Sequence, residues 1–481
     1  MKINILLCLT LFSVIANGQV RQPHSLYFME TIPQISQMNP AFQPRANGYV
    51  MLPGVNVDLI SELAVKEILQ QQKNNWYLPV QSDYDFKKLW YSIGEKETVS
   101  FNSGTDVDIF GYGIRVGAGY FSFGLSEHFI ANTTLPSDLF RIAEQRDVPN
   151  KKTYDFSPLH AQAMAFMQIR LGYSRKLNDR LTLGVNVKPL FGHAAFVSEV
   201  EKFKVVRENS ILTSDVRGSV YTSKIIDKIE KDNAEDYYNV IFKNFEDNKS
   251  MDWINYGADF TNPGVAFDIG AAYQITKRFT VSAALNNLGF VSWKEDVKWL
   301  SSNISVSYDE ESDVELDEWL AYLKDELNNS FKFREQQDKF TTTLSPVLHA
   351  GASYQLFESL SVGLLSRTVF WKNHARQSFN LSGYFQPYSF FALNAGATLQ
   401  VKGNFYMGGG LTFLLGPLQI YVLADYIPIK YYSLITDDGD KIPYIPEHPK
   451  TFTVRTGLNL IFGRHGFANK PMLDRRKNSW N

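Results

Sequence analysis

The chain has 481 residues, with 48 Lys and Arg against 50 Asp and Glu, and 14% of its residues are aromatic. The balanced charge excludes a protein that works mainly by electrostatic binding of nucleic acid, because no excess of basic side chains is available to neutralise phosphates. A mean hydropathy of −0.21, without repeated apolar runs of about 20 residues, also excludes a polytopic helical membrane protein.

Residues 1–18 have the pattern of a secretory signal. Lys2 supplies a positive charge, Ile3–Ile15 is a short apolar run, and small residues at Ala16 and Gly18 offer a cleavage site. The only cysteine of the chain, Cys8, lies inside this segment. We therefore expect a cleaved, exported chain whose mature part has neither disulfides nor thiol ligands.

The next segment, residues 19–47, does not resemble a strand. Tyr27–Pro44 is polar and interrupted by proline, and it includes the string Asn39–Phe42. Proline fixes φ and cannot donate to a sheet ladder. We expect this segment to thread the lumen of a barrel or to lie on its periplasmic rim.

Residues 48–463 are dominated by strands in which apolar and polar residues alternate. Within Pro263–Ile275, for example, Phe267 and Ile269 share one face and Asp268 lies on the other. Such alternation fits a soluble sandwich with its apolar face inward, or a membrane barrel with that face toward lipid. The strands run about 10 residues, the polar faces are rich in small residues, and aromatics gather near the strand ends, all of which favour the barrel. We predict an all-β fold, a closed antiparallel transmembrane β-barrel of about 14 strands.

Helix-like spacing of apolar residues interrupts this pattern. Two long insertions, residues 199–256 and 295–339, contain predicted helices at Ser223–Asp247 and Val314–Asn328, and shorter helices are predicted at Leu59–Gln71 and Ser137–Gln145. We expect these helices to cover or plug the barrel mouth, or alternatively to form a surface for a partner or a ligand gate. The basic tail, residues 464–481, is expected to hang free in the periplasm.

A few charged residues stand within the predicted strands and are candidates for the lumen lining. One interpretation is that they pair with one another and fill the lumen, and the other is that they form a selectivity lining or a ligand site. They are Arg115, Arg170, Lys188, Asp268, Arg367, Asp425 and Arg455.

Motifs for catalysis or for a metal are missing from the sequence. The eight histidines have no metal-ligand spacing, and no HExxH, GxSxG or P-loop occurs. Gly111, Gly113 and Gly117 miss the dinucleotide-binding pattern. We therefore expect no metal, no cofactor, no catalytic residues and no enzyme. A Ser or Asp within hydrogen-bond reach of a His in the lumen would revive an enzymatic function.

Six strings occur in order along the chain: Tyr27–Met29, Gln37–Pro44, Asn286–Trp293, Gly363–Thr368, Gly416–Tyr421 and Arg455–Gly463. Together they resemble a Bacteroidota family of outer-membrane barrels of unknown function. The Asn-Pro-Ala-Phe, Gly-Pro-Leu-Gln and Gly-Leu-Asn-Leu-Ile-Phe-Gly strings are similar to barrels of the PorP/SprF kind associated with type IX secretion, and the Asn-Leu-Gly hairpin resembles FadL-like barrels. The resemblance implies a fold and a location, and it carries over no functional residue.

We therefore expect a non-enzymatic barrel in the outer membrane of a Gram-negative cell, in contact with lipid and not with nucleic acid. One hypothesis is FadL-like passage of a small apolar or amphipathic solute, which predicts an apolar pocket near the N-terminal segment. The alternative is an accessory barrel of an envelope machine, of the type IX secretion or outer-membrane assembly type. That alternative predicts a plugged, dry lumen and an envelope protein partner.

Overall fold

A computed structural model describes most of the chain between residues 22 and 464. The described residues are 22–63, 65–68, 70–72, 75–77, 86–94, 96–144, 153–208, 211–232, 237–242, 259–309, 322–323, 326, 332–334, 339–370, 375–401, 404–426, 431–435, 441–446 and 450–464. The predicted signal at 1–18 and the basic tail from residue 465 onward lie outside them.

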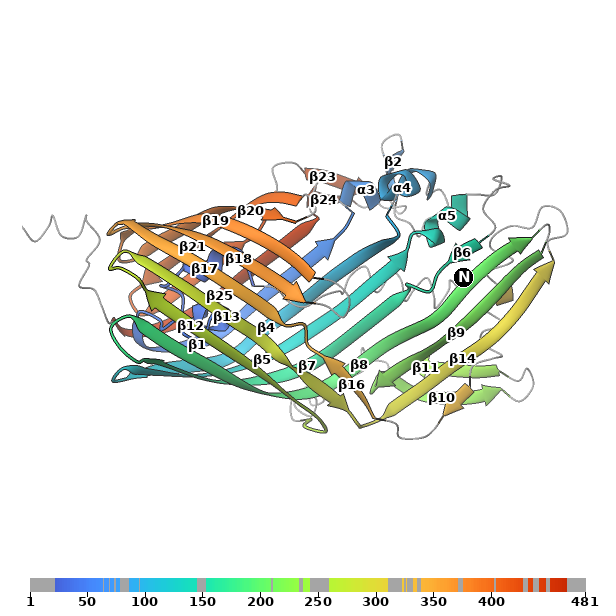
Figure 1. Ribbon diagram of the computed structural model, residues 1–481, viewed down its shortest axis with the longest axis horizontal. Helices are drawn as coiled ribbons and strands as arrows, with labels where there is room; N and C mark the ends of the chain where they lie inside the picture. The colour runs from blue at the N-terminus through green and yellow to red at the C-terminus, as the bar shows by residue number, and fades with distance from the viewer. Residues whose placement is uncertain are drawn as a thin grey trace, which may run out of the picture.

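A closed ring of 14 antiparallel strands forms the body of the molecule (Figure 1). Each strand pairs with the next in the ring, and the last, β25, pairs with β1 and closes the barrel. Closure leaves no unpaired edge in the wall, as a strand structure in lipid requires. The predicted barrel is therefore confirmed. The ring consists of β1 (Ala46–Ser61), β4 (Thr98–Val116), β5 (Gly119–Pro136), β7 (His160–Lys176), β8 (Leu181–Glu208), β12 (Asn262–Gln274), β13 (Phe279–Trp293), β17 (Val347–Phe357), β18 (Leu360–Phe370), β19 (Ala375–Tyr388), β20 (Phe391–Gln400), β21 (Asn404–Leu415), β22 (Leu418–Ala424) and β25 (Thr451–Arg464).

Short turns gather at one end of the barrel, on the left in Figure 1, and we call this the turn end. The links β4–β5, β7–β8, β12–β13 and β17–β18 are all of this kind. At the opposite end, the loop end, β8 continues past the wall and pairs with β9 (Ile211–Ser223), which in turn pairs with β14 (Val297–Asp309). These three strands make a sheet that projects beyond the barrel.

Small elements complete the described structure, mostly at the loop end. The strands β6 (Thr153–Asp155), β15 (Lys332–Arg334) and β16 (Phe340–Thr343) add to the main sheet. Three separate hairpins are formed by β2 (Gln70–Gln72) with β3 (Asn75–Tyr77), β10 (Ile226–Asp232) with β11 (Tyr237–Phe242), and β23 (Tyr431–Ile435) with β24 (Lys441–Pro446). The helices are η1 (His24–Phe28), α2 (Ile35–Met38), α3 (Val65–Ile68), α4 (Phe86–Ile93) and α5 (Asp138–Glu144). None of the helices in the described part of the chain is long and apolar enough to cross a membrane.

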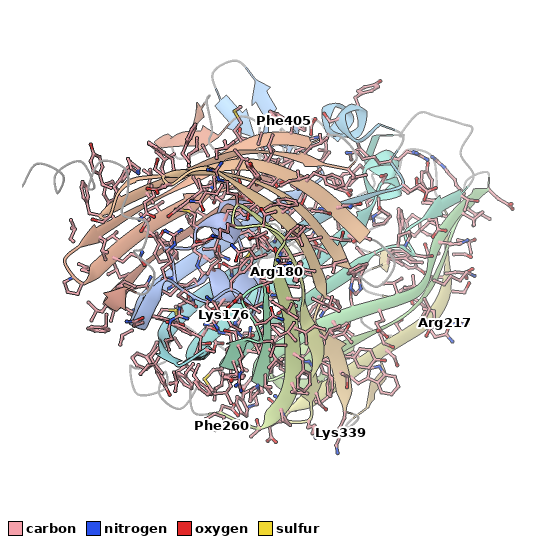
Figure 2. All side chains as sticks on the ribbon, turned by 60° about the vertical axis from the view of Figure 1, so that its left-hand side comes forward. Lys176, Arg180, Arg217, Phe260, Lys339 and Phe405 are labelled. Atoms are coloured by element: carbon pink, nitrogen blue, oxygen red, sulfur yellow. The ribbon has the colours of Figure 1, made fainter. Side chains whose placement is uncertain are left out.

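The outer wall of the barrel is apolar and the inner wall is polar. On β12, Phe267 and Ile269 are 44% and 52% exposed, whereas Asp268 between them is fully buried. Figure 2 shows a further outward side chain, Phe405 on β21. A soluble sandwich would bury the apolar set, so its exposure around a closed wall identifies a lipid-facing surface.

The structure corrects two of the predicted helices. In place of a helix over Ser223–Asp247 the described residues form the hairpin of β10 and β11, because strand pairing overrides a local helix-like spacing. In place of Leu59–Gln71, β1 runs on to Ser61 beside β4, and only α3 is helical.

Of the other two predicted helices, the structure describes one. The helix predicted at Ser137–Gln145 is confirmed as α5. Val314–Asn328 lies almost wholly outside the described residues.

Candidate functional site

Residues 22–45 fill the turn-end half of the lumen, and we call this segment the plug. Its side chains Leu26, Tyr27 and Met29 are fully buried against inward residues of the wall, including Leu365 and Leu423. Figure 1 shows the segment inside the barrel near the turns. The stretch that reads as a poor strand is thus the part of the chain that the barrel encloses.

Glycines in the wall make room for the plug. A Cβ atom at Gly184 would lie 2.2 Å from the carbonyl oxygen of Pro40, and one at Gly270 would lie 2.1 Å from the side-chain oxygen of Asn39. The Asn39 amide nitrogen lies 3.4 Å from the carbonyl oxygen of Ala271 and 3.3 Å from that of Ala283. The Asn-Pro-Ala-Phe string is therefore shaped to lie against bare backbone of β8, β12 and β13.

Four of the predicted lumen charges hold the plug. Arg367 donates to the carbonyl oxygen of Gln22 over 2.8 Å, and Arg115 donates to the plug at its turn-end exit, to the carbonyl oxygen of Pro44 over 2.7 Å. Asp425 pairs with the ring of the plug residue His24. Arg455 contacts plug glutamines and also forms a 2.5 Å ion pair with Asp108 of β4.

Two further predicted charges pair with each other. Lys188 Nζ lies 2.7 Å from Asp268 Oδ1, and both side chains are buried. Asp268 also accepts the backbone N–H of Asn287, which has a positive φ of 61°. The β12–β13 register shifts beside Asp268, so this ion pair stabilises an irregular point of the wall.

The seventh charge, Arg170 on β7, is buried, and it forms no ion pair with another of the described residues. Its guanidinium extends over Gly124, where an added Cβ would meet Nη2 at 3.1 Å. Its Nη1 atom is buried and has no hydrogen-bond partner among the described residues. A buried cation with an unused donor is costly, and the cavity described next lies beside it.

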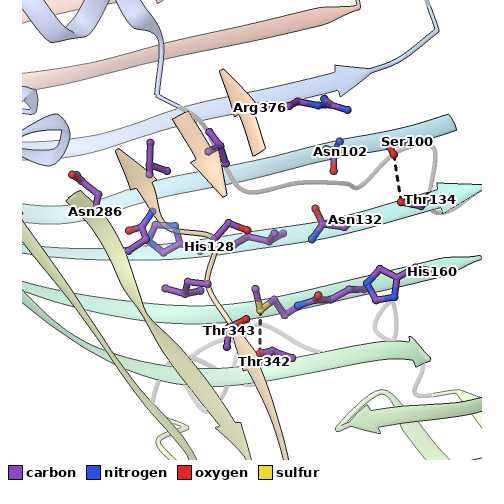
Figure 3. Close-up of a pocket in the computed structure, with 18 of the residues that line it drawn as sticks. Ser100, Asn102, His128, Asn132, Thr134, His160, Asn286, Thr342, Thr343 and Arg376 are labelled. Carbon is purple, nitrogen blue, oxygen red and sulfur yellow. Dashed lines mark hydrogen bonds between the residues drawn. The ribbon is translucent and has the colours of Figure 1, made fainter. Parts of the chain in front are cut away.

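A cavity of about 1410 Å³ occupies the loop-end half of the lumen (Figure 3). Plug residues Gln22 and Met38 are part of its lining at the inner end, and the exposed side chains of Lys96 and Lys339 line it near the loops. Amides and hydroxyls share its wall with apolar residues such as Phe166. The lumen is therefore plugged at one end and hollow at the other, with a mixed lining.

The cavity wall carries a serine, a histidine and an aspartate in contact. Ser126 Oγ lies 2.9 Å from His128 Nε2, and His128 Nδ1 lies 2.5 Å from Asp106 Oδ1. None of these three residues was among the predicted lumen residues. A Ser-x-His pair in an alternating strand places both side chains on one face, but nothing in the sequence shows which aspartate lies opposite. Among the described residues no group of three potential ligands could hold a metal ion.

The chain is similar to solved structures of barrels at low identity. A Pseudomonas aeruginosa FadL homologue is 12% identical, with a TM-score of 0.45, and the match covers 94% of this chain and 100% of that one. The Ralstonia pickettii toluene transporter TbuX is 10% identical, with a TM-score of 0.43 and the same coverage. The monoaromatic hydrocarbon channel CymD is 10% identical, with a TM-score of 0.44, covering 94% of this chain and 99% of that one.

Comparison at the level of sequence gives one match. No curated protein matches the chain, and the relation to Bacteroidota and to PorP/SprF-type barrels stays a prediction. A family model described as a family of unknown function, DUF5723, matches residues 40–425. The matched part runs from the plug residue Pro40 to the plug-binding Asp425 and so includes most of the barrel wall. The chain belongs to this family of unknown function, DUF5723.

Proposed function

We propose that the protein is an outer-membrane barrel that admits a small amphipathic solute from the loop end, and that the plug gates further passage. The observation that carries the proposal is the cavity of about 1410 Å³, which reaches exposed residues near the loops and ends on the plug. Its mixed lining suits a solute with polar and apolar parts better than a purely apolar one. The lipid-facing wall supports the proposed location in the outer membrane.

The gate is held by directional contacts that can be weakened one at a time. Asn39 and Pro40 lie directly on Gly270 and Gly184 of the wall, where no side chain larger than hydrogen fits. A leucine at Gly270 must therefore displace this part of the plug. Gly383 of β19 offers a matched control, because a Cβ atom there meets nothing within 4 Å.

The test compares entry of phenyl-β-glucoside and of sucrose into proteoliposomes by a swelling assay. We expect wild-type protein to admit phenyl-β-glucoside in preference to sucrose, Gly270→Leu to admit both faster, and Gly383→Leu to behave as wild type. The proposal is overturned if neither wild type nor Gly270→Leu admits more of either solute than vesicles without protein.

The alternative, an accessory barrel of an envelope machine, is favoured by the plugged turn-end half of the lumen. A component that carries no solute has no need of an open path. Purification from native membranes distinguishes the two functions, because a stoichiometric envelope protein partner, together with no solute entry in the swelling assay, would favour the accessory barrel.

A further inference from the structure

Ser126, His128 and Asp106 meet on the cavity wall because of the way two neighbouring strands pair. Ser126 and His128 are two residues apart on β5, so both point into the lumen. Asp106 of β4 lies directly opposite His128 in the antiparallel register. The three side chains thus stand in the order hydroxyl, imidazole, carboxylate, which is the order of a nucleophile, its general base and the group that orients the base.

A β-bulge brings the aspartate inward. On β4, Tyr112 and Phe110 face outward, and strict alternation would also turn Asp108 and Asp106 outward. The register shifts between Asp108 and Phe110, Ile109 and Phe110 are both exposed, and Asp106 and Asp108 are buried on the lumen side. Bulges re-aim side chains in this way and occur often beside active sites.

Neighbouring groups hold the carboxylate and the ring in place. Asp106 Oδ2 accepts from Gln22 of the plug over 3.0 Å and from Asn56 over 3.3 Å. The His128 ring stacks on Phe166 of β7, with ring centres 5.0 Å apart and an angle of 14° between the planes. In a neutral His128 ring, Nδ1–H donates to Asp106 Oδ1. The other ring nitrogen, Nε2, then carries no proton and can accept the hydroxyl proton of Ser126.

The wall beside Ser126 offers donors for a developing negative charge. Gln168 lies opposite Ser126 on β7, and its amide nitrogen is 3.5 Å from Ser126 Oγ. Two residues farther along β7 is Arg170, whose buried Nη1 has no partner among the described residues. Donors fixed beside the nucleophile stabilise an oxyanion because they need no reorganisation during the reaction.

The opposite side of Ser126 is apolar. Phe166 lies across from His128, and beyond it Ile130 and Met164 face each other across the same strand pair. All three line the cavity. Along β5 and β7 the wall is therefore apolar at one end, carries the Ser126–His128 contact in the middle, and ends with the amide of Gln168 and the guanidinium of Arg170. This order matches an ester whose short acyl chain lies on the apolar part and whose carbonyl oxygen lies beside the amide and the guanidinium.

A second group of a serine, a histidine and an aspartate lies elsewhere in the lumen and has a purely structural role. His24 contacts Ser378 and Asp425 through its two ring nitrogens. Its side chain is 1% exposed, and neither His24 nor Asp425 lines the cavity. By contrast, the His128 side chain is 15% exposed, and Ser126, His128 and Asp106 all line the cavity. Figure 3 shows His128 in this wall.

We propose that the loop-end cavity is the active site of a hydrolase for carboxylic esters with a short apolar acyl chain. Ser126 is the nucleophile, His128 is the general base and acid, Asp106 is a positioning residue, and Gln168 and Arg170 bind the oxyanion. The inference does not depend on solute passage through the plug.

The reaction needs only the ester and water. Ser126 Oγ bonds to the carbonyl carbon while its proton moves to His128 Nε2, and the carbon–oxygen bond to the alcohol breaks as Nε2 returns that proton to the leaving oxygen. Water then attacks the acyl carbon and gives a proton to Nε2. Ser126 Oγ leaves, recovers that proton, and the carboxylic acid is released.

The first test is covalent labelling of full-length protein in detergent with a fluorophosphonate, followed by peptide mass spectrometry. The phosphonyl group is expected on Ser126, with loss of fluoride and transfer of the hydroxyl proton to His128. Ser126→Ala must abolish the label. Ser100→Ala is the matched control, because Ser100 also lines the cavity but its hydroxyl contacts Thr134 instead of a histidine.

The second test is hydrolysis of p-nitrophenyl butyrate. Ser126→Ala and His128→Gln are expected to lower kcat/KM at least about 10²-fold, with Ser100→Ala unchanged. Asp106→Asn should lower kcat with little change in KM, and Asp106→Glu should restore part of kcat, which a merely structural loss would not do. Barrel folding of each variant is checked by heat-modifiable migration in gels.

The proposal is wrong if the fluorophosphonate does not label Ser126 in the wild-type protein. It is also wrong if folded Ser126→Ala hydrolyses the ester as fast as wild type. Should a variant fail to fold, labelling of the wild-type serine still decides. Failure of solute entry in proteoliposomes with labelling intact would reject only the gated barrel.

Discussion

The cost of an arginine on the outer wall depends on its depth in the membrane, and β8 allows that dependence to be tested. Val187 is 36% exposed and pairs with the outward residues Phe267 and Leu171. A strand rise of about 3.4 Å per residue and a tilt of about 40° advance the chain about 2.6 Å per residue along the membrane normal. Counted from Leu181 at the turn, Val187 therefore lies about 16 Å into an apolar band about 25 Å tall, whereas Leu183 lies about 5 Å into it.

We expect Val187→Arg to lower the free energy of unfolding by about 2–4 kcal/mol and Leu183→Arg by only about 0–1 kcal/mol, because the guanidinium reaches the headgroups from the shallower site. The assay is reversible urea unfolding from lipid vesicles, followed by tryptophan fluorescence. Val187→Ala is the control for lost apolar area, with an expected cost below about 1.5 kcal/mol. Equal costs for the two arginines, or a wild-type protein that stays dissolved without detergent, would refute the lipid-facing assignment.

Two further predictions concern buried and exposed charge. Lys188→Met should lower the free energy of unfolding by about 3–5 kcal/mol because it leaves the Asp268 carboxylate buried without its cation, and adding Asp268→Leu should recover part of the loss in the same urea assay. If the double variant is no more stable than Lys188→Met, the ion pair is not the cause. In the projecting sheet, hydrogen bonds from Lys202 and Ser305 lower the pKa of Asp215, so its stabilisation is present at neutral pH and is lost as the pH falls through that lowered pKa. Unfolding measured between about pH 6 and about pH 3 should therefore depend less on pH in Asp215→Asn than in wild type, and identical dependence would contradict this role.

Local pattern accounts for most of the fold. Alternation along each strand shows which residues share a face, and the strand length together with the apolar, aromatic-rich set indicates lipid on one side. Closure of these strands into a barrel follows because a wall in lipid must satisfy all of its backbone groups. The two corrected helices lie in β10–β11 and at the end of β1, where pairing partners distant in sequence decide the conformation.

The predicted lumen charges illustrate the limit of such reasoning. Each of the seven could be placed on the polar face of a strand, yet the partners of Arg455 and Asp425 include the plug residues Gln37 and His24, hundreds of positions away. Which charge meets which depends on how the closed wall wraps around the plug. A periodic pattern within one strand shows which face a charge lies on, but not which distant residue it contacts.

A two-residue period and the chemistry of each side chain were enough to predict a lipid-facing barrel, its inward and outward sets, and a proline-interrupted segment unsuited to the wall. Contacts between residues distant in the chain place this segment in one end of the lumen and bring Asp106 to His128 and Ser126 at the other. Asp106 reaches His128 because the bulge at Ile109 turns Asp106 to the inner face and shifts the register between β4 and β5. The bulge appears in the sequence of β4 as two consecutive apolar residues, Ile109 and Phe110, but which side chain then lies opposite Asp106 depends on the pairing of two strands.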